Sequence, residues 1–234
     1  MKNLIKCHLN YLISKTTIIV SLIAGLIIVI ISISSVLMLD KNVKYSENNY
    51  LYFYNGFLIT KIIIVIFSVF IFGYSFSSKS DQYIIILVAA GITRTRIITT
   101  KILALSMVMF ILCYFSYFQY LLIGLVFFKE FIFMMDYLIA YIALYMIAYF
   151  FGLVSMLLIQ IFDNIYTIII PFALMNLSEI LNEYKGSIIK VINLIIPYYT
   201  KDFTFEFGWM HALIWIIILV LMNAYYYDKK DIKC

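Results

Sequence analysis

The segment that most resembles a nucleotide-binding motif runs from Gly73 to Ser80 and reads GlyTyrSerPheSerSerLysSer. It has the Lys-Ser ending of the phosphate loop G-x-x-x-x-G-K-[ST] but lacks that motif's second glycine. It also follows an apolar stretch typical of a long helix, where a phosphate loop follows a strand. The backbone N–H groups that cradle phosphate are therefore not expected here, and we expect this chain to bind no ATP itself.

The thiols and imidazoles, which could serve as metal ligands or catalytic groups, are widely scattered: Cys7, Cys113, Cys234, His8 and His211. They form no C-x-x-C and no H-E-x-x-H, and no nucleophile stands beside a base. We therefore predict no disulfide framework, no metal site, no cofactor and no catalytic residue, and we do not expect an enzyme. The two histidines are predicted to be interfacial polar residues.

A stretch from Lys79 to Lys101 interrupts the apolar sequence on its charged side. Ser80 is suited to cap a helix, and Asp81 would lie in the first turn, where the helix dipole favours an acid. The apolar residues Tyr83 to Ala90 are too few to cross a bilayer, which needs about 20 residues. We predict a short interfacial helix that ends at Gly91, since glycine is the usual residue at a helix stop.

A second helix should follow, with Thr93 as its cap. Arg94 and Lys101 are seven residues apart and therefore share a face of this helix, with Arg96 nearly opposite. A short helix, a glycine break and a cluster of cations together indicate a docking surface.

Composition defines the broad class. The chain has 234 residues, of which 65% are hydrophobic and 12% charged, well above the roughly 45 to 50% apolar content of soluble domains. The net charge of +5 comes from cations at the ends of apolar segments, with no basic run, so nucleic acid is not an expected partner. We predict an all-α membrane protein, in contact with membrane lipid, whose residues 1–234 form a single domain.

Six apolar segments are expected to cross the membrane, after an amphipathic interfacial helix at the N-terminus, Met1 to Lys15. They are Thr16 to Leu39, Phe57 to Phe76, Ile102 to Phe128, Tyr137 to Phe162, Asn164 to Ser178 and Phe207 to Tyr227. The fifth is short and contains Pro171, which predicts a kink or a local rearrangement. Glu179 to Phe207 is too polar and broken for a span, and we expect helical elements that dip into the outer leaflet there.

Three features within the spans have functional alternatives. The aromatic residues Tyr50 to Tyr54 precede the second span and favour an interfacial belt, the alternative being an outer gate or a substrate contact. Lys61 lies one turn inside that span's outer end, where it can snorkel to the headgroups. Gln119 and Gln160 are the notable polar residues of the third and fourth spans. They are suited either to interhelical hydrogen bonds or to a translocation path.

Charge placement predicts the orientation. With both termini inside, the inner segments hold ten Lys or Arg and four acids, while the outer segments hold seven and eight. This agrees with the positive-inside rule. A secondary transporter usually carries ionisable groups inside its spans, and none is expected at mid-membrane here. The sequence therefore favours a translocation subunit that takes its energy from another protein.

Several of these features resemble the membrane subunits of ABC type-2 permeases. That family has an acid-led coupling helix between spans two and three, then a small-residue turn, an Arg and, seven residues on, a Lys, which match Asp81, Gly91, Arg94 and Lys101. The usual acidic-basic pair with Gly-Thr at the start of the helix is replaced by AspGlnTyrIle. The family also has re-entrant helices between spans five and six with an Asn-x-x-Pro-like turn, here Asn193 to Pro197.

The resemblance implies a permease subunit in a bacterial plasma membrane that works with cytoplasmic ATP-binding-cassette ATPase subunits and a second permease copy. The docking residues would be Asp81, Gly91, Arg94, Arg96 and Lys101. A composition rich in Ile, Asn, Lys and Tyr is typical of low-GC bacteria, where such permeases export amphipathic or antimicrobial peptides and other hydrophobic compounds. The alternative is a six-helix accessory or immunity protein that binds a peptide or partner without transporting it.

Overall fold

The computed structural model describes residues 2–12, 15–37, 45–76, 78–128, 135–182, 196 and 208–229, and every regular element in these ranges is a helix. The helices, in chain order, are α1 (Lys2–Leu12), α2 (Lys15–Leu37), α3 (Tyr45–Tyr74), α4 (Ser78–Ala89), α5 (Arg94–Phe128), α6 (Met135–Phe162), the 3₁₀ helix η1 (Ile165–Ile168), α7 (Ile169–Asn182) and α9 (Gly208–Lys229). The predicted all-α fold is confirmed.

Four helices are long and apolar enough to cross a membrane: Leu51–Tyr74 of α3, all of α5, all of α6 and all of α9. Six spans were predicted. The first and fifth of these correspond to shorter apolar stretches in the part of the chain that the structure describes, Leu22–Leu37 of α2 and Tyr166–Leu177 of η1 and α7. Within the described residues these two stretches are shorter than the four long helices, although α2 as a whole has 23 residues.

The fifth apolar stretch has the local rearrangement that its proline predicted. Asn164 caps η1 by accepting a 2.9 Å hydrogen bond from the backbone N–H of Tyr166. The chain then becomes α-helical at Ile169, so Pro171 lies in the first turn of α7, where its missing N–H removes no helical hydrogen bond. The irregularity therefore lies before the proline, in the 3₁₀ turn.

The centre of the bundle is the contact between α3 and α6, the most extensive in the structure. The two helices run in the same direction and exchange hydrogen bonds across their interface. Ser68 Oγ donates to the carbonyl of Ala148 at 2.6 Å, and Ser155 Oγ donates to the carbonyl of Val69 at 2.9 Å. Gly152 permits this close approach, because a Cβ there would lie 2.6 Å from Ser68 Oγ.

Aromatic side chains fill the bundle near the start of α3. Phe53 stacks on Tyr137 of α6 with ring centroids 3.6 Å apart, and Tyr52 packs against Tyr120 of α5. Tyr52 and Phe53 are both buried. The prediction of an interfacial belt is therefore wrong for these two residues, because α3 starts at Tyr45 and presents them to its neighbours.

The outer faces of the peripheral helices are strongly apolar. Leu22, Leu26 and Ile30 of α2 and Met210 and Leu221 of α9 each expose more than half of their surface. Water would oppose such exposure, whereas lipid tails are as apolar as these side chains. The four long apolar helices and these faces make a membrane location plausible.

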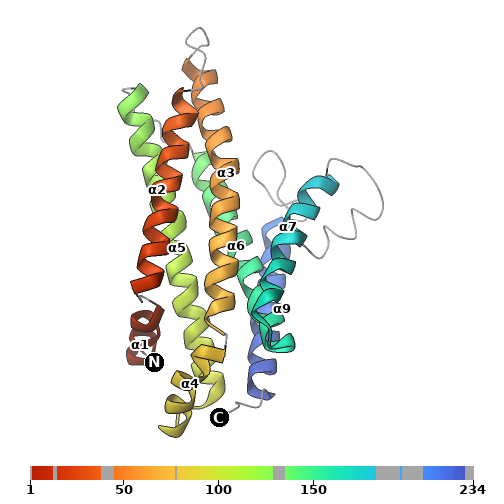
Figure 1. Ribbon diagram of the computed structural model, residues 1–234. Helices are drawn as coiled ribbons and strands as arrows, with labels where there is room; N and C mark the ends of the chain where they lie inside the picture. The colour runs from red at the N-terminus through yellow and green to blue at the C-terminus, as the bar shows by residue number, and fades with distance from the viewer. Residues whose placement is uncertain are drawn as a thin grey trace.

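One end of the bundle collects several helix ends that are far apart in the sequence. Figure 1 shows α1, α4 and the last turn of α9 at the same end, beside the start of α5. Contacts between α1 and α5 and between α5 and α9 agree with this arrangement. The stretch that the sequence singled out as a docking surface is therefore surrounded by the beginning and end of the described chain.

Candidate functional site

The turn between α4 and α5 has the geometry expected at a helix C-terminus. Gly91 has φ +80°, a left-handed conformation that favours glycine. Its N–H donates to the carbonyl of Val88 at 2.9 Å, and the N–H of Ile92 donates to the carbonyl of Leu87 at 3.2 Å. This pair of hydrogen bonds is the Schellman motif, so the glycine stop predicted from the sequence is confirmed.

Of the two predicted helix caps, one is at the expected position and the other is not. Thr93 immediately precedes α5 and its carbonyl accepts a 3.1 Å hydrogen bond from the N–H of Ile97, which places it at the predicted cap position. Ser80, in contrast, lies inside α4, because that helix already begins at Ser78. The prediction that Ser80 caps the helix is therefore wrong. Helix starts among consecutive Ser, Lys and Asp residues are weakly defined by sequence.

Lys101 connects the two ends of the segment that carries α4. Only 1% of its surface is exposed, its Nζ donates a hydrogen bond to the carbonyl of Ser75, and it lies 4.1 Å from the ring centroid of Phe76. Ser75 follows the last turn of α3, where free carbonyls and the helix dipole both favour a cation. The ammonium therefore ties the exit of α3 to the first turns of α5.

Arg94 makes the corresponding contact with α9. Its Nη1 donates to the carbonyl of Asp228 at 3.1 Å, at the C-terminal end of that helix, where a cation is again favoured. Arg94 and Lys101, seven residues apart on α5, thus each bind the end of another helix. The sequence predicted that they share a face. The sequence did not predict that these two cations would contact the ends of α3 and α9.

The remaining predicted docking residues, Asp81 and Arg96, are not equally well described by the structure. Arg96 is exposed at the start of α5. Asp81 lies on α4, but its side chain is outside the description. Near the end of α4, Ile86 is 66% exposed, whereas Ile84 is buried and holds the helix to the bundle. The surface available to another molecule at this end therefore includes Ile86, Gly91 and Arg96. Lys101 is not part of that surface.

His8 attaches α1 to this junction and was not singled out by the sequence as more than an interfacial residue. It is 1% exposed and lies beside Ile97 and Lys101 of α5. Burial and the charge of Lys101 lower the pKa of its imidazole from 6.5 to about 4. One signal could have been used: His8 is four residues after Leu4, on the apolar face of α1.

Acid should therefore weaken the docking of α1. Because the pKa of His8 is lower in the folded protein than in the unfolded chain, its contribution to stability is fully present above pH 6.5 and is lost as the pH falls toward 4. We expect the melting midpoint of the purified protein to drop more between pH 7.5 and pH 4.5 in the wild type than in His8→Gln. Equal drops in the two proteins would contradict this role.

The two glutamines predicted as a translocation path are not brought together. Gln119 is roughly 37 Å along α5 from Arg94 at 1.5 Å per residue, whereas Gln160 lies two residues before the end of α6. Gln160 is buried and donates from Nε2 to Oδ1 of Asn223 at 3.1 Å. Asn223 in turn donates to the carbonyl of Leu153. Gln160 therefore takes part in an α6–α9 hydrogen-bond network, the interhelical alternative.

Lys61 is a buried cation within the candidate span of α3. It is only 6% exposed and is the eleventh of the 24 residues of the span in α3. The sequence placed the start of this span at Phe57, which made Lys61 an outer residue that could snorkel. The helix instead continues through the polar and aromatic residues before Phe57, so Lys61 lies well inside α3.

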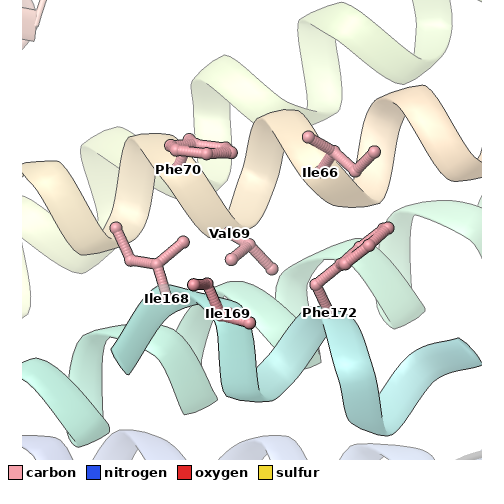
Figure 2. Close-up of a pocket in the computed structure, with 6 residues that line it drawn as sticks. All are labelled: Ile66, Val69, Phe70, Ile168, Ile169 and Phe172. Carbon is pink, nitrogen blue, oxygen red and sulfur yellow. The ribbon is translucent and has the colours of Figure 1, made fainter. Parts of the chain in front are cut away.

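An apolar pocket of about 260 Å³ lies between α3 and the segment of η1 and α7. Figure 2 shows that Ile66, Val69 and Phe70 come from α3, and that Ile168, Ile169 and Phe172 face them from the other side. This lining can hold only an apolar group. The predicted re-entrant turn, Asn193 and Pro197, lies outside the described residues.

Among the described residues, His, Cys, Asp and Glu form no group of three that could hold a metal ion. No protein-family model matches the chain, and no curated protein matches its sequence.

Proposed function

We propose that this chain is the membrane-spanning permease subunit of an ATP-driven exporter, of the ABC type-2 kind. The observation that carries the proposal is the way α4 is attached to the rest of the bundle. This short helix ends in a left-handed glycine, exposes Ile86, and is bordered by two cations that bind the ends of α3 and α9. A partner that displaced α4 would therefore act on α5, the helix whose two cations contact the ends of α3 and α9.

In this proposal both termini and α4 face the cytoplasm of a bacterial cell. The shared location of α1, α4 and the end of α9 supports an even number of crossings. Six is the number we propose, with α2 and the η1–α7 segment as the additional two. The excess of Lys and Arg on the segments around α1, α4 and the end of α9 supports the orientation.

The partners in this proposal are cytoplasmic ATPase subunits and a second permease copy, identical or related. The exported substrate would be amphipathic or hydrophobic, such as an antimicrobial peptide, because the pocket between α3 and α7 offers only apolar contacts. Energy would come from the partner, so this chain would not be an enzyme.

The decisive experiment is purification of the tagged chain from its native membrane in mild detergent. We expect it to carry with it an ATPase that contains a complete phosphate loop, encoded in an adjacent reading frame. The complex in nanodiscs should hydrolyse ATP. Recovery of the chain without any nucleotide-binding subunit would reject the proposal and favour an accessory or immunity protein.

The orientation has a separate test in the native cysteines. Cys7 is exposed on α1, whereas Cys113 is buried in α5. We expect a membrane-impermeant maleimide to leave Cys7 unmodified in intact cells, because α1 faces the cytoplasm, and to modify it after permeabilisation. A Cys7→Ser variant identifies the reactive site. Reaction of Cys7 in sealed cells would place the N-terminus outside.

A second candidate function is an ion-coupled carrier, and Lys61 is the observation that favours it. An ionisable side chain buried within a span commonly marks a transport pathway. Transport by the purified chain in liposomes under an ion gradient, without any ATPase, would support this candidate. Loss of that transport in Lys61→Met would assign it to the lysine.

A further inference from the structure

A group of buried polar side chains lies where α3, α5 and α6 meet. At its centre is Tyr141 of α6, which is 3% exposed. Its ring is 5.3 Å from that of Tyr117 and 6.3 Å from that of Tyr120, both on α5. Its hydroxyl is also close enough to Cys113 and Tyr52 to interact with them electrostatically. Three helices therefore bring four phenols and a thiol into one small region.

The phenols of this group differ in their hydrogen bonds. Tyr52 donates to the backbone carbonyl of Tyr120 at 3.1 Å, and the hydroxyl of Tyr120 is 3.2 Å from that of Thr60. The hydroxyl oxygens of Tyr117 and Tyr141 are also buried, yet neither bonds to any protein group in the part of the chain that the structure describes. Two satisfied and two unsatisfied phenols therefore lie side by side.

A buried hydroxyl without a partner destabilises a fold, because it has given up its hydrogen bonds to water. Native proteins usually satisfy such groups with an ordered internal water, which needs a polar site and at least two partners. Tyr117 and Tyr141 supply two donors on neighbouring rings, whose centroids are 5.3 Å apart. A hydrophobic packing role alone would be served equally well by phenylalanine at both positions.

We propose that Tyr117 and Tyr141 form an internal site that binds water within the bundle. The bound water accepts hydrogen bonds from these two phenols, which come from α5 and α6. This inference does not depend on a transport function or on any partner protein, and it can be tested on the purified chain alone.

The first measurement is thermal unfolding of phenylalanine variants in nanodiscs. If the hydroxyls bind water, Tyr141→Phe and Tyr117→Phe each remove a hydrogen bond and lower the melting midpoint by a few degrees. If the hydroxyls have no partner, the same substitutions remove a buried polar group and raise the midpoint or leave it unchanged. Tyr120→Phe serves as the matched control, because it loses the bond to Thr60 and should lower the midpoint in either case.

The second measurement uses the unmodified protein. Hydroxyl radicals produced by X-ray radiolysis in ¹⁸O-water oxidise side chains that touch bound water, so Tyr141 should acquire ¹⁸O. Tyr52 is equally buried but donates to a protein carbonyl, and it should stay unlabelled. The proposal is overturned if Tyr141 carries no label, or if Tyr141→Phe fails to lower the midpoint.

Discussion

Replacing Gly152 by valine is expected to destabilise the bundle strongly, by forcing apart the central pair of helices, α3 and α6. The Cβ that valine adds would lie 2.6 Å from Ser68 Oγ and 2.8 Å from the ring of Phe72. Real Cβ atoms do not approach so closely, so α3 and α6 would have to separate. Overpacking of this kind costs about 3 kcal/mol, and loss of the hydrogen bond from Ser68 to Ala148 adds to that cost.

The measurement is the yield of folded protein after detergent extraction, followed by its melting midpoint. Gly25→Val is the matched control, because a Cβ at Gly25 has no atom within 4 Å. We expect Gly25→Val to behave like the wild type and Gly152→Val to aggregate or to melt at a much lower temperature. Similar midpoints for the two variants would contradict the close packing of α3 on α6.

The features that the sequence predicted correctly around α4 are local ones. Gly91 stops a helix and Thr93 precedes the next one because their own backbone preferences favour those positions. The shared face of Arg94 and Lys101 follows from the seven-residue spacing. These features need only the identity of a residue and its immediate neighbours, and the structure has each of them.

The partners of the same cations depend on tertiary structure. Nothing near Lys101 in the sequence indicates that its ammonium would be buried against the last turn of α3, because the two residues are 26 positions apart. The start of α3 was not predictable for a related reason. The sequence placed the start of the second span at Phe57, yet α3 begins at Tyr45, and Tyr52 and Phe53 pack against α5 and α6. Tertiary contacts of this kind override local composition.

Hydrogen bonds that cross between helices were likewise not predictable. Ser68 and Ser155 are isolated serines in apolar runs, where their usual acceptor is the carbonyl four residues earlier in the same helix. Both instead donate to the facing helix. The small residue that makes this possible, Gly152, could have been recognised, since glycines inside spans often mark close helix contacts.

The turn after α4 gives the sharpest test of the proposed coupling. Gly91→Val should leave the protein inserted in the membrane at near-normal level, because a side chain at this exposed turn meets no atom within 4 Å. The strain comes from φ +80°, which β-branched residues rarely adopt. Relief of that strain would disrupt the Schellman hydrogen bonds and change the angle between α4 and α5.

If α4 transmits the action of an ATPase, Gly91→Val should abolish export and substrate-stimulated ATP hydrolysis together. Gly91→Asn is the matched control, because asparagine tolerates the left-handed conformation, and it should retain most of both activities.

Asp81→Lys tests the same helix through charge. If Asp81 contacts a basic residue of the partner, a lysine at this position would repel that residue at close range. We expect this variant to insert normally and to lose both activities. Normal export by both Gly91→Val and Asp81→Lys, with the ATPase still bound, would place the docking site elsewhere in the protein.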